Sequence, residues 1–172
     1  MTRVSKNFWR KILNIGPILL LYFLSISEID THFSNLFEIL SFNLQLIVVF
    51  YWMLRGASLL GNSHIFFAGI INDVIMGLPM GISSLTYLTV SFVASYLAEV
   101  TVNRTLMTDW FSFFIALFCS NVIFLILISN LTSFTINFTE IFYNTFFTFL
   151  FYPIFWLIFN IYKTLMYIQN DA

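Results

Sequence analysis

A single carboxylate, Asp73, lies within a long apolar stretch, and glycines flank it at four-residue steps. A charged side chain at the middle of a bilayer costs roughly 2.5–3.5 kcal/mol on insertion scales, so an acid kept there needs a packing or functional reason. Positions four residues apart lie on one side of a helix, and small residues there let a neighbouring helix approach closely. The sequence therefore predicts a helix-packing or partner-contact surface made of Gly69, Asn72, Asp73, Gly77, Pro79 and Gly81.

Three roles are open for Asp73. It is a hydrogen-bonded structural acid, a group that holds a partner helix, or a site of proton or ion coupling. Coupling is the least favoured, because transport relays usually need several buried ionisable groups.

A second polar stripe follows later in the chain, again at four-residue steps: Glu140, Asn144, Thr148 and Tyr152. We expect it to face inward from an otherwise Phe-rich span. Pro153 directly follows the stripe. Because proline lacks a backbone N–H, it should leave the Phe149 carbonyl without its helical donor and kink the helix.

No residue set predicts catalysis. Cys119, His32 and His64 have neither metal-ligand nor nucleophile–base spacing, and there is no glycine-rich phosphate loop. We therefore expect no catalytic, cofactor-binding or metal-binding residues, no cofactor, and no enzyme activity. Asp109 and Glu99 are expected to be ordinary solvated charges in a loop.

The composition is that of an integral membrane protein. Apolar residues make up 60% and charged residues 9% of the 172 residues, whereas soluble domains are about 25% charged. The continuous apolar runs favour helices over a β-barrel. We predict an all-α fold, with residues 1–172 as one membrane domain and six transmembrane helices in a compact bundle. The spans cover about residues 12–27, 36–54, 65–78, 82–98, 110–129 and 138–161.

Basic residues set the orientation. All seven Lys and Arg residues fall before span one or after spans two, four and six, so the positive-inside rule places both termini in the cytoplasm. Trp9, Trp52 and Trp110 flank the same ends and are expected in the headgroup zone. The net charge of −1 argues against nucleic acid, and membrane lipids are the expected surroundings. A cleaved signal peptide over residues 1–27 is a less favoured alternative with the same orientation.

The order of features over residues 51–97 resembles the rod shape-determining protein MreD family of bacteria. Tyr51-Trp52 closes the second span, and a Gly-x-x-x-Asp-x-x-x-Gly-x-x-x-Gly pattern runs from Gly69 to Gly81. The chain length, basic start and six-span hydropathy also match. In place of the proline that often opens the family's second span, this chain has Ser41-Phe42-Asn43.

The resemblance implies a non-enzymatic scaffold in the bacterial inner (cytoplasmic) membrane that acts in the elongation machinery and cell-shape control. Its implied partner is a bitopic MreC-like protein, with indirect links to MreB-like filaments and peptidoglycan synthases. The family is also similar in architecture to the substrate-binding subunits of energy-coupling-factor vitamin transporters.

Two other classes are open. The chain is alternatively a vitamin-type small-molecule binding subunit of a transporter, with a cavity lined by Asp73, Asn72, Glu140 and Asn144. A membrane-embedded enzyme of lipid metabolism is the third and weakest reading, because buried acids can be catalytic.

Overall fold

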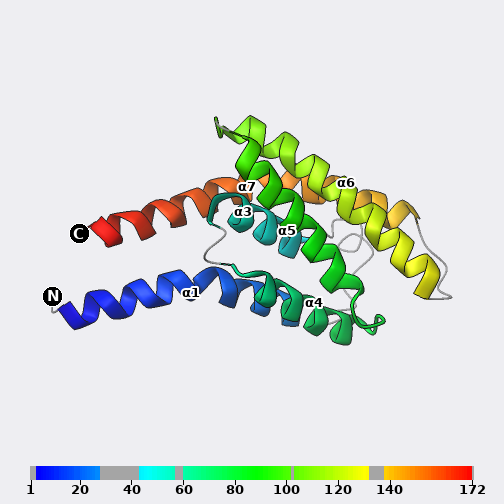
Figure 1. The fold of residues 1–172 in the computed structure, drawn as a ribbon, viewed down its shortest axis with the longest axis horizontal. Helices are drawn as coiled ribbons and strands as arrows, with labels where there is room; N and C mark the ends of the chain where they lie inside the picture. Colours follow the sequence, from blue (N-terminus) through cyan, green and yellow to red (C-terminus); the bar gives the residue numbers. More distant parts are fainter. Residues whose placement is uncertain (1–2, 28–42, 57–59, 102, 132–137, 172) are drawn as a thin grey trace.

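The fold is helical throughout the part of the chain described by a computed structural model, residues 3–27, 43–56, 60–101, 103–131 and 138–171 (Figure 1). These ranges hold six helices. They are α1 (Arg3–Ser27), α3 (Leu44–Gly56), α4 (Asn62–Met76), α5 (Ile82–Val100), α6 (Leu106–Leu131) and α7 (Phe138–Asp171).

Successive helices alternate in direction, so both chain ends lie at the same end of the molecule (Figure 1). We call this the terminal end, and the opposite end, where α4 turns into α5, the turn end. The α5 helix packs against α3, α4 and α6, while α1 and α7 lie against α3.

The α3 helix is the centre of the fold because its sequence is apolar on every face. Each residue from Leu46 to Leu54 is at most 5% exposed. A helix that is hydrophobic all round has no side to offer to water and is normally surrounded by other elements. Trp52 therefore lies in the core at 1% exposure, and the prediction that it anchors the headgroup zone is wrong.

Two helices, α6 and α7, are long and apolar enough to cross a membrane, judged by length and composition over the described residues. Large apolar side chains such as Phe111, Phe118 and Phe142 lie exposed on their outer faces. Apolar patches of this kind mark surfaces that contact lipid or a partner protein.

Several helices extend past the predicted spans. The α1 helix begins at Arg3 and α7 ends at Asp171, beyond the apolar limits at residues 12 and 161. Lys and Arg are good helix formers, so a helix can continue after its apolar run ends. Residues 36–42 of the second span, and the acidic link with Glu28, Asp30 and His32, lie outside the described residues.

Candidate functional sites: two buried acids and a polar cavity

The turn between α4 and α5 is built around Asp73. The α4 helix ends at Met76, and Gly77 follows in the left-handed conformation with φ of 65°. This conformation carries little penalty for glycine and lets the next N–H groups fold back onto the helix. The backbone N–H groups of Gly77 and Leu78 both donate to the Asp73 carbonyl, the latter at 2.9 Å.

The Asp73 carboxylate closes the other side of the same turn. Its Oδ2 accepts the Gly81 N–H at 2.7 Å, and its Oδ1 accepts the Ser83 N–H at 2.8 Å. The side chain is fully buried. The first N–H groups of a helix lack partners within the helix and carry partial positive charge. Asp73 thus caps the start of α5 from the end of α4, and both of its oxygens are used inside the protein.

The predicted glycine stripe divides into two kinds of position. Gly69 lies against α5, where a Cβ atom would come within 2.5 Å of the Ser84 backbone nitrogen. Gly77 and Gly81 have open space around them and instead adopt positive φ values of 65° and 107°. Pro79 lies half-buried between them. Gly69 therefore provides close helix contact, while Gly77 and Gly81 provide the turn.

Asn72 links α4 to α3 and α5 through its side-chain amide, and its partner Gln45 extends the network to α1. Its Nδ2 donates to Ser83 Oγ at 3.2 Å, and its Oδ1 accepts from Gln45 Nε2 at 3.2 Å. The same Gln45 nitrogen lies 3.3 Å from the Leu24 carbonyl of α1. A buried amide is tolerated when such partners satisfy it.

The second predicted stripe is buried at one end only. Thr148 and Tyr152 are fully buried. The Thr148 hydroxyl donates to the Asn144 carbonyl at 2.6 Å and accepts the Asn43 N–H at 2.8 Å. Tyr152 stacks on Phe113 with ring centres 4.4 Å apart. Asn144 is half-buried and Glu140 is exposed.

A cavity of about 360 Å³, whose wall contains several polar side chains among apolar ones, lies toward the turn end between α3, α4, α5, α6 and α7. We call it the polar cavity. Asn72, Glu140 and Asn144 line it, so the structure brings together three of the four residues expected in a small-molecule cavity. Asp73 is absent from the lining, because its carboxylate faces the α5 backbone. Further amide and hydroxyl groups on the wall come from Asn43, Ser83, Thr86, Asn121 and Thr145.

The second buried acid, Asp109, lies at the terminal end, where a charge was expected but its burial was not. It is 1% exposed, so the prediction of a solvated loop charge is wrong. Its Oδ2 accepts from Arg55 Nε at 2.9 Å, from Arg55 Nη2 at 2.5 Å and from Trp156 Nε1 at 2.9 Å. The guanidinium also lies 5.0 Å from the centre of the Trp156 ring. This cluster joins the end of α3, the start of α6 and the middle of α7.

Two further basic side chains cover the carbonyls at the end of α3. Arg104 donates to the Leu54 carbonyl, and Lys163 donates to the Arg55 carbonyl at 2.9 Å. The last carbonyls of a helix lack intrahelical donors and carry partial negative charge, so cations are favoured beside them. Together with Asp109, these cations hold α3, α6 and α7 at fixed positions relative to one another.

The helix α7 runs through Pro153 without interruption. The Phe149 carbonyl, which has no helical donor because of Pro153, accepts the Trp110 indole N–H at 2.9 Å. The two rings also stack, with centres 5.0 Å apart. Trp110 is therefore a bridge between α6 and α7, which its place at a span end did not indicate.

No group of three His, Cys, Asp or Glu side chains among the described residues is placed to hold a metal ion. His64 is exposed, and its Nδ1 lies 3.3 Å from the Tyr22 hydroxyl. Comparison with known proteins adds no family, since no protein-family model, curated protein or solved structure matches this chain.

Proposed function

We propose that the chain is a six-span protein of the bacterial inner membrane with both termini in the cytoplasm. Three facts support this placement: the alternating helix directions, the two long apolar helices, and the exposed Phe-rich faces of α6 and α7. Arg55, Arg104 and Lys163 all lie at the terminal end, which is the cytoplasmic end under the positive-inside rule.

Within that membrane we assign the protein a scaffolding role of the MreD type in the elongation machinery. One observation carries this proposal: Asp73, the acid of the family-like motif, has both carboxylate oxygens bonded to the backbone of α5. The motif therefore makes a rigid helical hairpin, and its acid is engaged by the protein's own amides. A rigid hairpin suits a protein that works by holding partner helices.

The implied partner is a bitopic MreC-like protein, through which the scaffold would connect MreB-like filaments to peptidoglycan synthases. The apolar faces of α6 and α7 offer contact area for a single partner helix in lipid, where association depends on packing and interhelical hydrogen bonds.

Co-purification tests this role. The tagged chain is expressed with the MreC-like protein of its own genome and extracted in mild detergent, with an unrelated single-span protein as control. Selective recovery of the MreC-like protein is the expected result. Equal recovery of both, or of neither, contradicts the proposal, and reporter fusions at each terminus check the topology separately.

The polar cavity supports a second candidate function, a small-molecule binding subunit of a transporter. Its volume of about 360 Å³ lies within the usual range of ligand sites, and its amides and hydroxyls suit a polar organic molecule. Thermal unfolding measured with a panel of vitamins tests this reading. A specific, saturable rise in melting temperature that is lost in Asn72→Leu would favour it over the scaffold.

A further inference from the structure

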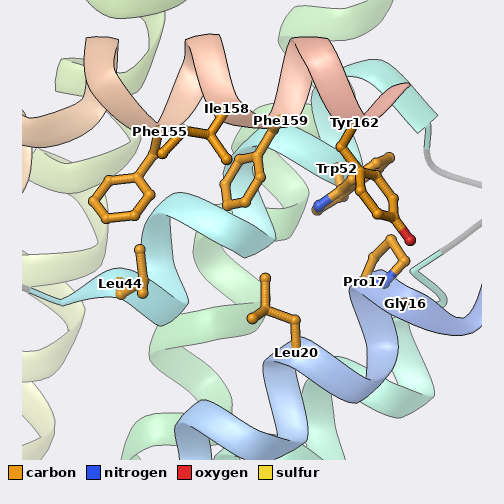
Figure 2. A pocket seen from close by; sticks show the side chains of 9 residues that line it. All are labelled: Gly16, Pro17, Leu20, Leu44, Trp52, Phe155, Ile158, Phe159 and Tyr162. Carbon is orange, nitrogen blue, oxygen red and sulfur yellow. The ribbon is translucent and has the colours of Figure 1, made fainter. Parts of the chain in front are cut away.

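A second cavity, of about 380 Å³, lies between α1, α3 and α7, and its wall is almost entirely apolar (Figure 2). Its apolar side chains include Leu20 from α1, Leu44 from α3, and Phe155 and Phe159 from α7. Well-packed interiors contain few voids larger than a water molecule, so a space of this size indicates room for an occupant.

One polar atom of the wall has no partner. Trp52 is 1% exposed, and its indole Nε1 has no hydrogen-bond acceptor among the described residues. Figure 2 shows this nitrogen turned toward the space between α1 and α7. A buried N–H left unbonded is destabilising, and an acceptor on an occupant would remove that cost.

The cavity is closed at one end and open at the side. A Cβ atom at Gly16 would collide with the Tyr162 hydroxyl, so the absence of a side chain at Gly16 lets Tyr162 pack against α1. Ile158, which also lines the cavity, is 50% exposed. An occupant can therefore enter between α1 and α7 from the surroundings of the protein.

We propose that this cavity binds one hydrocarbon chain of a membrane lipid, with the lipid's ester carbonyl accepting the Trp52 indole N–H. A whole helix is about 10–12 Å across with its side chains and is too wide for the space. A polar vitamin would leave most of its own groups unbonded against this wall. A flexible chain with a single acceptor matches both the shape and the unbonded Trp52 N–H.

This inference rests on the membrane placement proposed above, because the side opening must face acyl chains. Reporter fusions and membrane fractionation separate the two claims. A protein that does not insert contradicts the membrane placement, whereas an inserted protein without site-specific lipid binding contradicts only the inference.

Photo-crosslinking tests the site. The full chain is reconstituted in vesicles of phosphatidylethanolamine and phosphatidylglycerol that contain a phospholipid with a diazirine in one acyl chain. After illumination, labelled peptides are identified by mass spectrometry. We expect enrichment on the α1 and α7 residues of the cavity wall over the exposed faces of α6. Uniform labelling of all lipid-facing helices would overturn the proposal.

Three variants test the site and the carbonyl contact separately. Leu20→Trp fills the cavity and should reduce labelling of its wall at least five-fold, while Leu19→Trp, at a neighbouring position that is 58% exposed, should leave it unchanged. Trp52→Phe keeps an aromatic ring, removes the donor and should lower labelling two- to five-fold. Equal wall labelling in wild type and Trp52→Phe would overturn the carbonyl contact. Equal labelling in both leucine variants would overturn the site. If Leu20→Trp does not fold, the labelling of the wall relative to α6 in the wild-type protein decides.

Discussion

The two buried acids of this protein are held in opposite ways. Asp73 bonds to backbone N–H groups eight and ten residues further along the chain. Asp109 bonds to side chains 54 and 47 residues away. The first acid organises one helical hairpin, and the second joins three helices that meet at the terminal end. The carboxylate of Asp73 therefore caps a helix that is close in sequence, whereas the carboxylate of Asp109 connects helices that are far apart in sequence.

The difference has an energetic consequence. The Asp73 carboxylate lies at the start of α5, where backbone dipoles favour an anion without needing a cation. Asp109 needs Arg55, because a buried ionised pair is tolerated only when both members are present and bonded. Removing the carboxylate should therefore lower the free energy of unfolding more at Asp109 than at Asp73.

The largest effect is expected for Asp109→Leu. It leaves the Arg55 guanidinium, whose side chain is 14% exposed, without its anion. Breaking a buried pair in this way typically costs about 3–5 kcal/mol. Chemical unfolding in detergent micelles measures the loss. The double variant Arg55→Leu/Asp109→Leu should recover part of it, and a double variant as unstable as the sum of both single variants would contradict the pairing.

A smaller loss, about 2–4 kcal/mol, is expected for Asp73→Leu, because the N–H groups of Gly81 and Ser83 lose their acceptor. Hydrogen exchange of the Gly81 and Ser83 amides measures whether these N–H groups are still hydrogen-bonded. They should exchange much faster in the variant, while amides in α7 stay protected. Unchanged exchange at Gly81 and Ser83 would mean that Asp73 does not cap α5.

The smallest effects are expected for Gly69→Ala and Gly77→Ala. The same substitution should destabilise the protein by overpacking at Gly69 and by backbone strain at Gly77. Gly69→Ala places a methyl group against the Ser84 backbone and should cost about 1–3 kcal/mol through overpacking. Gly77→Ala meets no neighbour and costs about 1–2 kcal/mol through its left-handed backbone. Only Gly69→Ala should weaken a disulfide crosslink engineered between α4 and α5. Equal crosslinking in both variants would contradict the close approach at Gly69.

The hairpin could be anticipated because its signals are local. The spacing of Gly69, Gly77 and Pro79 around Asp73 marks both the close contact and the turn within a dozen residues. Such patterns depend on backbone geometry that each residue type imposes by itself. Even so, the sequence did not separate the packing role of Gly69 from the turn role of Gly77.

The Asp109 cluster was missed because nothing near Asp109 in the sequence identifies its partners. Arg55 and Trp156 reach it only after α3, α6 and α7 have packed together. One signal was present: Arg55 and Asp109 are opposite charges predicted at the same membrane face. Trp52 was misplaced for a similar reason, because an apolar helix near a predicted interface can equally be the centre of the fold.

The central claim is that the protein acts as a scaffold whose buried acids are structural. Asp73→Asn tests it most directly, since the amide keeps the shape and one acceptor oxygen but cannot exchange a proton as a relay or catalyst must. The measurement is recovery of the MreC-like partner per mole of folded protein. The account predicts recovery within two-fold of wild type. A folded, membrane-inserted Asp73→Asn protein with ten-fold lower recovery would contradict it.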